Sequence, residues 1–170
     1  MTHLPNEVWL LIASCCQPRD LWLSLRPLSR QLQQCAEQFF EENLLPKTKL
    51  TLPVSFPTYD VRSPIYGKAV FLPLQVAVRL LDSHDDCRIT YSLTETDPET
   101  YETQFRDRWS RMSKTADGYL DEKMKWEVQL FDRRVDVKLK DPMATGTSRG
   151  ADTDAIVSFD WKCSMTIFFR

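Results

Sequence analysis

The adjacent residues His84-Asp85-Asp86-Cys87 carry imidazole, carboxylate and thiol groups, all of which can bind metal ions. Adjacent side chains point in different directions, however, and no second cluster in the sequence completes a tetrahedral set of ligands. This spacing is more typical of a solvated turn. We therefore expect no bound metal and no cofactor.

Residues for nucleophilic or acid–base catalysis are also scarce. A cysteine nucleophile needs a nearby histidine base, and of the two histidines His3 lies at the N-terminus, where chain ends fray. The paired carboxylates of Asp85-Asp86 and Asp121-Glu122 lack the apolar surroundings that raise the pKa of one carboxyl group. Residues 146–150 contain two glycines but lack the lysine of a phosphate-binding loop. The sequence therefore predicts no catalytic residues and no enzyme.

Three arginines, Arg106, Arg108 and Arg111, lie close together in the sequence and could bind an acidic or phosphorylated segment of a client protein. Guanidinium groups bind phosphate through paired hydrogen bonds, which makes such a cluster a candidate client-binding site. Asp107 and Glu102 lie nearby in the sequence. A solvated, charged helix face is therefore the alternative interpretation of the same residues.

Charge and composition exclude several classes of protein. The 170 residues include 22 basic and 24 acidic side chains, mixed along the chain, with a formal net charge of −2. Without a basic stripe to neutralise phosphates, a nucleic-acid partner is not expected. The five cysteines follow no disulfide spacing and are expected to be reduced. With neither a signal peptide nor an apolar stretch of about 18 residues, we expect no membrane partner and a location in the cytoplasm, the nucleus or both.

The N-terminal part of the chain is predicted to be helical. Apolar side chains recur at every third or fourth position over residues 5–44. Pro5 suits a first helical turn, Pro18 begins a second helix, and Pro27 precedes a third, longer one. A module of about 45 residues encloses little core. Its leucines are therefore expected to need the surface of a partner.

From Lys49 onward the apolar period becomes two, which predicts strands. Pro53 in the first strand suggests that this strand lies at a sheet edge. Residues 125–140 are a hairpin candidate with its turn at Asp132-Arg133. The strand-like runs after the first are residues 69–81, 89–93, 126–130, 135–139 and 157–169.

One helix is predicted inside the sheet region, at about residues 98–113. Thr96-Asp97-Pro98-Glu99 supplies a capping box. Residues 141–154 lack periodicity and are predicted to form a surface loop. The predicted fold class is α+β, with helices in residues 1–46 and a mainly antiparallel sheet domain in residues 47–170, for which a sandwich is one arrangement. The apolar stripe expected to pack the helix on the sheet consists of Tyr101, Phe105, Trp109 and Met112.

The helical module resembles an F-box. The similarity lies in the order and spacing of a leucine-proline opening, an acidic residue two positions on, an isoleucine further along the helix, a proline-x-acid-leucine step and a hydrophobe-serine-arginine triplet. In that order, these features are Leu4-Pro5, Glu7, Ile12, Pro18-Arg19-Asp20-Leu21 and Leu28-Ser29-Arg30. The resemblance implies a three-helix surface that docks on a Skp adaptor. Through the adaptor the chain would join the cullin and RING subunits of a ubiquitin ligase of the SCF type.

The F-box resemblance also implies which residues contact the adaptor. Cys15-Cys16 and Pro27 depart from the family pattern, and the smaller cysteine side chains are expected to weaken docking by about 1 kcal/mol. Trp9 and Trp22 are added anchors, because buried tryptophans dominate many interfaces. The predicted adaptor-binding residues are Leu4, Pro5, Val8, Trp9, Ile12, Leu21, Trp22, Leu25, Leu28 and Leu32.

Beyond the F-box, the chain is similar to short F-box proteins of filamentous fungi, in which one compact domain follows the box. The similar segments are residues 108–112, 137–142 and 158–170. This implies a non-catalytic subunit that recognises a client of unknown identity and holds it near the conjugating enzyme. Two alternatives stay open: an adaptor-binding scaffold without a ubiquitylated client, and a ligand-binding module with a pocket at Trp126, Trp161 or Tyr119.

Overall fold

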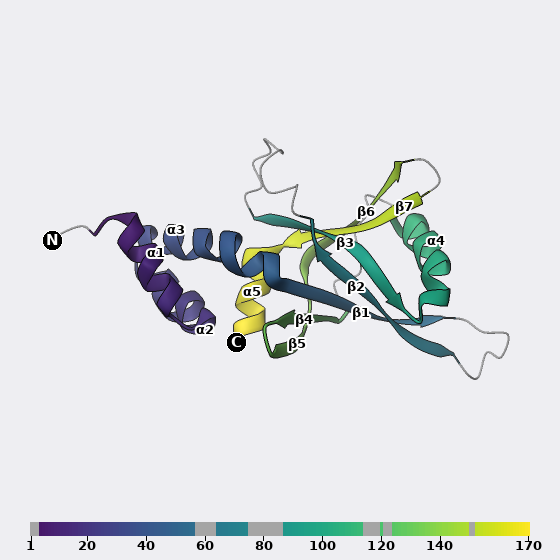
Figure 1. The fold of residues 1–170 in the computed structure, drawn as a ribbon, viewed down its shortest axis with the longest axis horizontal. Helices are drawn as coiled ribbons and strands as arrows, with labels where there is room; N and C mark the ends of the chain where they lie inside the picture. The colour runs from purple at the N-terminus through teal and green to yellow at the C-terminus, as the bar shows by residue number, and fades with distance from the viewer. Residues whose placement is uncertain (1–3, 57–63, 75–86, 114–119, 121–123, 150–151) are drawn as a thin grey trace. The chain divides into compact units, whose positions relative to one another are not determined.

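The computed structural model describes residues 4–56, 64–74, 87–113, 120, 124–149 and 152–170. The chain divides into two compact units, one formed by Met1–Lys47 with Phe169–Arg170 and the other by Thr48–Phe168. The first unit is helical, and the second is built on a sheet (Figure 1). The predicted α+β class, with helices followed by an antiparallel sheet, is confirmed.

Helices divided by prolines make up the first unit. Pro18 occupies the start of α2, and Pro27 lies in the tight turn before α3, as predicted. Ser29 caps α3, because its Oγ accepts a hydrogen bond from the backbone N–H of Leu32 at 3.2 Å. The bounds are α1 (Asn6–Cys15), α2 (Pro18–Asp20), η1 (Leu21–Leu25), η2 (Arg26–Leu28), α3 (Arg30–Phe39), η3 (Phe40–Leu44) and η4 (Leu45–Lys47).

A small aromatic and charged cluster holds the helical unit together. The ring of Trp22 lies 4.5 Å from that of Phe40, and Phe40 meets the ring of Phe169 edge-on at 5.8 Å. The guanidinium group of Arg26 lies 4.3 Å from the centre of the Trp22 ring and donates to the carboxylate of Glu37 at 2.6 and 2.9 Å. This pair ties the η1–η2 segment to α3.

Seven strands of the described residues form one antiparallel sheet in the order β5-β4-β1-β2-β3-β7-β6. A second sheet, which a sandwich requires, is not seen among these residues. The predicted run 69–81 corresponds to β2 as far as Pro73, and residues 75–81 lie outside the described residues. The strand bounds are β1 (Thr48–Phe56), β2 (Ile65–Pro73), β3 (Arg88–Asp97), β4 (Trp126–Leu130), β5 (Arg133–Val137), β6 (Lys140–Arg149) and β7 (Asp152–Asp160).

The prediction that Pro53 marks an edge strand is wrong. β1 lies inside the sheet, between β4 and β2. However, β4 pairs only with the first part of β1, from Thr48 to Thr51, whereas β2 pairs along the strand as far as Phe56. Pro53 therefore lies beyond the end of β4, where its missing N–H leaves no ladder bond unmade.

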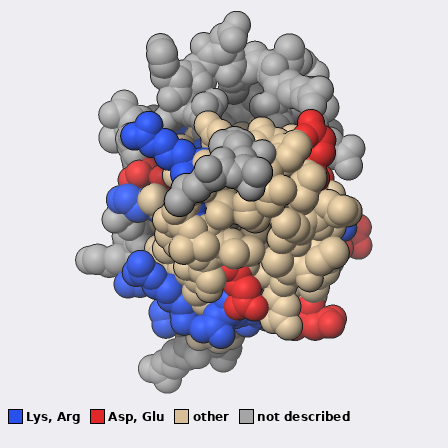
Figure 2. Space-filling view, turned by 90° about the vertical axis from the view of Figure 1, so that its left-hand side faces the viewer, with Lys and Arg blue, Asp and Glu red and all other residues tan. Residues whose placement is uncertain are grey.

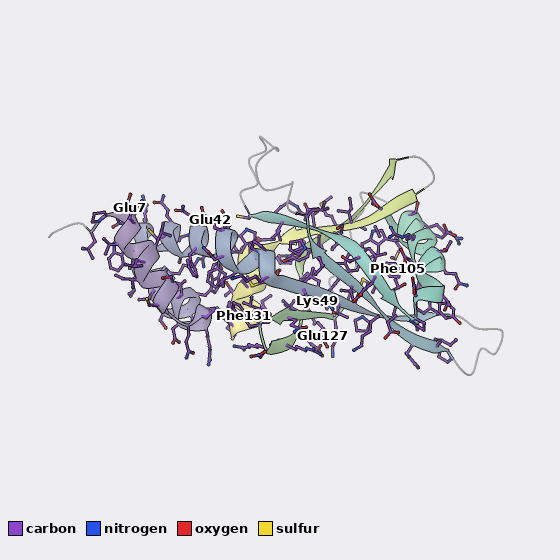
Figure 3. The ribbon with its side chains drawn as sticks, viewed as in Figure 1. Glu7, Glu42, Lys49, Phe105, Glu127 and Phe131 are labelled. Carbon is purple, nitrogen blue, oxygen red and sulfur yellow. The ribbon has the colours of Figure 1, made fainter. Side chains whose placement is uncertain are left out.

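One face of the sheet forms the core with α4 (Glu102–Ser113), which follows the short η5 (Glu99–Tyr101). Phe105 points from α4 toward the sheet (Figure 3). The ring of Trp109 lies 5.3 Å from that of Phe71 and 6.5 Å from that of Trp126. These three side chains and Phe105 are buried. The predicted helix and its apolar stripe are confirmed. The capping box is wrong, because Thr96 lies in β3 and the helical segment begins after Pro98 without a side-chain cap.

Two predictions for the C-terminal part of the chain are also wrong. Residues 141–154 are not a loop, since most of them pair in β6 and β7. The strand predicted for residues 157–169 ends at Asp160, and α5 (Trp161–Phe169) follows it. Asp160 starts this helix by accepting a hydrogen bond from the backbone N–H of Cys163 at 3.0 Å. Trp161, Met165 and Phe168 are buried at helical spacing. The apolar residues of this run therefore change from strand spacing to helix spacing after Asp160, which an uninterrupted apolar run does not show.

The predicted hairpin is confirmed, with its turn one residue earlier than expected. Leu130 pairs with Arg133, so the two turn residues are Phe131 and Asp132. Phe131 has φ of 54°, which is typical of the mirror-image turns that join tightly connected strands. It lies at the end of the β4–β5 hairpin (Figure 3).

A like-charge pair lies across this hairpin, where Glu127 of β4 is directly opposite Asp136 of β5. Like charges in this position are destabilising. We predict that Glu127→Lys raises the free energy of unfolding by about 0.5–1 kcal/mol in a urea titration. The matched control is Gln129→Lys, which places a cation opposite Arg134 and should give no gain. A loss of stability in Glu127→Lys would contradict the prediction.

Candidate protein-binding surface

Large apolar side chains are exposed on the helical unit. Leu11 is 67% exposed and Leu28 is 68% exposed, and Leu4, Val8 and Ile12 are exposed as well. Leu11 and Ile12 lie three and four residues after Val8 in α1, so both lie on the same side of the helix as Val8. Ala13 is buried, and α1 packs against α3. The outer face of α1 is thus left without apolar cover from the described residues.

Gln31 joins the two motifs that carry the F-box resemblance. Its Nε2 donates to the backbone carbonyl of Leu4 at 2.9 Å and to the Oδ1 atom of Asn6 at 2.8 Å. Gln31 lies in the first turn of α3, directly after Leu28-Ser29-Arg30. The leucine-proline opening and the hydrophobe-serine-arginine triplet therefore lie side by side, although they are far apart in the sequence.

Figure 2 shows a broad area of residues other than Lys, Arg, Asp and Glu. The central parts of protein-binding surfaces are usually poor in charged residues. We call Leu4, Pro5, Val8, Leu11, Ile12 and Leu28, all exposed, the apolar surface.

The predicted adaptor-binding residues differ in exposure. Leu4, Pro5, Val8, Ile12 and Leu28 are exposed, whereas Trp9, Leu25 and Leu32 are half-buried. Leu21 and Trp22 are each only 2% exposed. These two side chains lie in the core of the unit, so the contact with a partner must be made by the others. Leu11 is the residue that sequence reasoning missed, although its spacing from Val8 and Ile12 placed it on their face.

Removing the Gln31 side chain tests whether it holds the two motifs together. We predict that Gln31→Ala lowers the free energy of unfolding by about 1 kcal/mol, because two hydrogen bonds are lost. It should also speed amide exchange around Asn6. Gln34→Ala on the same helix is the control, since Gln34 is exposed, and it should stay within about 0.5 kcal/mol of wild type. Equal effects of both changes would contradict the role of Gln31.

The three arginines of the candidate client-binding site do not form one cluster. Arg106 is bound by the Glu102 carboxylate at 2.7 Å and lies 3.8 Å from that of Asp154. Arg108 donates to the backbone carbonyl of Ser55 at 3.3 Å, and Arg111 is exposed. At 3.6 residues per turn, Arg106 points about 160° away from Arg108 around α4. A client-binding role for Arg108 and Arg111 stays a prediction, and Arg106 is held by carboxylates of its own unit.

Two of the described cysteines, Cys35 and Cys163, have a raised thiol pKa. Burial, and then the nearby carboxylate of Glu7, raise the pKa of the Cys35 thiol. Hydrogen bonding to Asp160, and then burial, raise the pKa of the Cys163 thiol. Both thiols therefore stay protonated at neutral pH, whereas a reactive cysteine needs its thiolate form.

The sequence offered a metal site at residues 84–87 and a ligand pocket at Trp126, Trp161 or Tyr119 as alternatives, and the described residues do not form either of them. Residues 84–86 and Tyr119 lie outside the described residues. Among the described side chains, no group of three or more His, Cys, Asp or Glu residues could hold a metal ion. Trp126 and Trp161, which a ligand pocket would need at its wall, are buried in the packed core.

Within the described part of the chain, no helix has both the length and the apolar character needed to cross a membrane.

Comparison with known proteins found no relative of this chain. No protein-family model matches the chain, and no curated protein and no solved structure matches it either.

Proposed function

We propose that this protein is the substrate-recognition subunit of an SCF-type cullin–RING ubiquitin ligase, and that its helical unit docks on a Skp adaptor. The observation that carries this proposal is the pair of hydrogen bonds from Gln31. They bring Leu4-Pro5 beside Leu28-Ser29-Arg30, next to an exposed apolar face. Both motifs resemble those of an F-box in order and spacing, and their proximity is what a common docking surface requires.

The energetics of the apolar surface also support a protein partner. Fully burying one leucine or valine side chain stabilises a complex by about 1.5–3 kcal/mol before the costs of association. Val8, Leu11, Ile12 and Leu28 supply several such side chains on one small unit. Ser29 uses its hydroxyl to cap α3, so it holds Leu28 at the start of the helix and need not contact the adaptor itself.

The sheet unit is proposed to bind the client, without chemistry of its own. Docked on the adaptor, the chain would hold the client near the conjugating enzyme, so that the rate rises through effective concentration. Arg108 and Arg111 are the exposed basic residues on α4 that could contact an acidic client segment.

Co-purification with a Skp adaptor tests the docking step. We expect wild type to be retained by the immobilised adaptor, and the Leu4→Ala, Pro5→Ala variant to bind about tenfold more weakly or worse. The control is Leu72→Ala, which truncates an exposed leucine of the sheet unit and should bind like wild type. Failure of wild type to bind at all would refute the proposed function.

The ligase role itself requires a test in cells. If the chain marks clients for degradation, those clients accumulate when its gene is deleted. Restoring the full chain should lower them again, and restoring a chain that carries Leu28→Asp should not. A proteome that is unchanged by the deletion would contradict degradation, even if the adaptor binds.

A further inference from the structure

β5 is an edge of the sheet in the part of the chain that the structure describes (Figure 1). The two-residue turn makes Leu130–Arg133 the closing pair of the hairpin. The two residues of such a closing pair are joined by backbone hydrogen bonds. Along the hairpin from there, hydrogen-bonded residue pairs alternate with pairs that are not hydrogen-bonded. Arg133, Val135 and Val137 therefore direct their backbone groups toward β4. Arg134 and Asp136 direct theirs to the open side.

The exposed side chains of this edge alternate in charge. Arg134 and Asp136 of β5 are exposed and share one face of the strand. Asp132 in the turn and Lys138 just after the strand are exposed as well, and they continue the two-residue spacing on either side. The signs of these four residues run negative, positive, negative, positive along the chain. Read in the opposite direction, the order is positive, negative, positive, negative. An antiparallel copy of the same strand therefore presents the opposite charge at every one of these positions.

Asp136 also lacks a balancing charge within its own sheet. It is directly opposite Glu127, and neither carboxylate has a cation within ion-pair distance among the described residues. Glu127 lies on β4 (Figure 3). A cation on the open side of β5 would relieve this pair of like charges.

We propose that β5 pairs with β5 of a second copy of this chain, antiparallel and around a two-fold axis at Val135. This register sets Arg134 opposite Asp136 of the second copy, and the symmetry repeats the pair. Asp132 and Lys138 form the next pairs outward. The pairs of Arg134 and Asp136 fall where the backbone groups point outward, so each exchanges two backbone hydrogen bonds.

A second copy fits this edge better than an unrelated peptide, because one short sequence satisfies both the charge order and the hydrogen-bonding register. The contact between two five-residue strands is small. It should therefore form a weak dimer, with a dissociation constant between about 1 µM and 1 mM. The pairing uses none of the residues of the apolar surface and does not depend on the proposed function.

Sedimentation equilibrium of the full chain over this concentration range tests the proposal. We expect the mass to rise from that of one chain toward that of two. Arg134→Glu replaces both symmetric attractive pairs by repulsive ones, and it should raise the dissociation constant about tenfold or more. Circular dichroism should show that this surface variant stays folded.

The matched variant exchanges the two charges. Arg134→Glu combined with Asp136→Arg restores an opposite charge at each position, so it should return the dissociation constant to within about threefold of wild type. A single-chain mass for wild type throughout the concentration range would overturn the proposal. So would a dimer that the Arg134→Glu variant leaves unchanged, or one that the exchanged variant fails to restore.

Discussion

Replacing Trp109 with alanine is expected to lower the free energy of unfolding of the sheet unit by about 3–5 kcal/mol. Trp109 is completely buried, and its ring lies 5.3 Å from Phe71 and 5.6 Å from Phe105. Its indole N–H donates to the backbone carbonyl of Ile156 at 3.2 Å. The substitution therefore leaves a cavity between α4 and the sheet and removes a hydrogen bond to β7.

Urea unfolding followed by tryptophan fluorescence and circular dichroism measures this loss. Tyr66→Ala is the control, because Tyr66 is 78% exposed in β2 and should stay within about 0.5 kcal/mol of wild type. A cost below about 1 kcal/mol for Trp109→Ala would contradict a core centred on this residue. A loss near the upper end of the range would leave little of the stability of a typical domain.

Replacing Leu28 with aspartate is expected to weaken binding to a Skp adaptor about 100-fold, or about 3 kcal/mol. Leu28 is 68% exposed, so in the free chain the change should alter stability by no more than about 0.5 kcal/mol. In the complex, the same change places an unpaired carboxylate in an apolar contact, which is costly.

The control for Leu28→Asp is Phe131→Asp, which adds the same charge at another exposed apolar residue, in the sheet unit. Calorimetric titration of both variants with the purified adaptor separates a local effect from a general one. If the two variants lose affinity equally, or if Leu28→Asp binds like wild type, the apolar surface is not the docking site.

Much of the fold could be predicted because local signals agreed with the tertiary structure. Pro18 and Pro27 divide the helices at the positions that the sequence predicted. Proline has no backbone N–H, so it is tolerated in the first turn of a helix but not in its interior. The helix containing Phe105 and Trp109 was equally clear, because its apolar side chains repeat at helical spacing and are buried on one face.

The errors arise where pairing or packing with distant residues decides the structure. Residues 141–154 contain no alternation of their own, and they form strands because β6 and β7 pair with each other. Pro53 is tolerated inside the sheet only because β4 ends before it. The alternation of apolar and polar residues within one strand does not show where the neighbouring strand in the sheet ends.

The candidate surface was predicted in its residue types but not in its geometry. Leu4, Ile12 and Leu28 are exposed as expected, whereas Leu21 and Trp22 lie in the core. The Trp22 ring lies against Phe40 and under the guanidinium group of Arg26, which also binds Glu37. Nor could spacing alone show that Gln31 reaches back to Leu4, because that contact depends on how α1 packs against α3.

Amide hydrogen exchange of the full chain, with and without a purified Skp adaptor, tests docking most directly. We expect the adaptor to slow exchange in α1 and in the first turn of α3, around Leu28 and Gln31, while exchange in β3 stays unchanged. Absence of any slowing at saturating adaptor, or slowing confined to the strands of the sheet unit, would contradict the proposed docking surface.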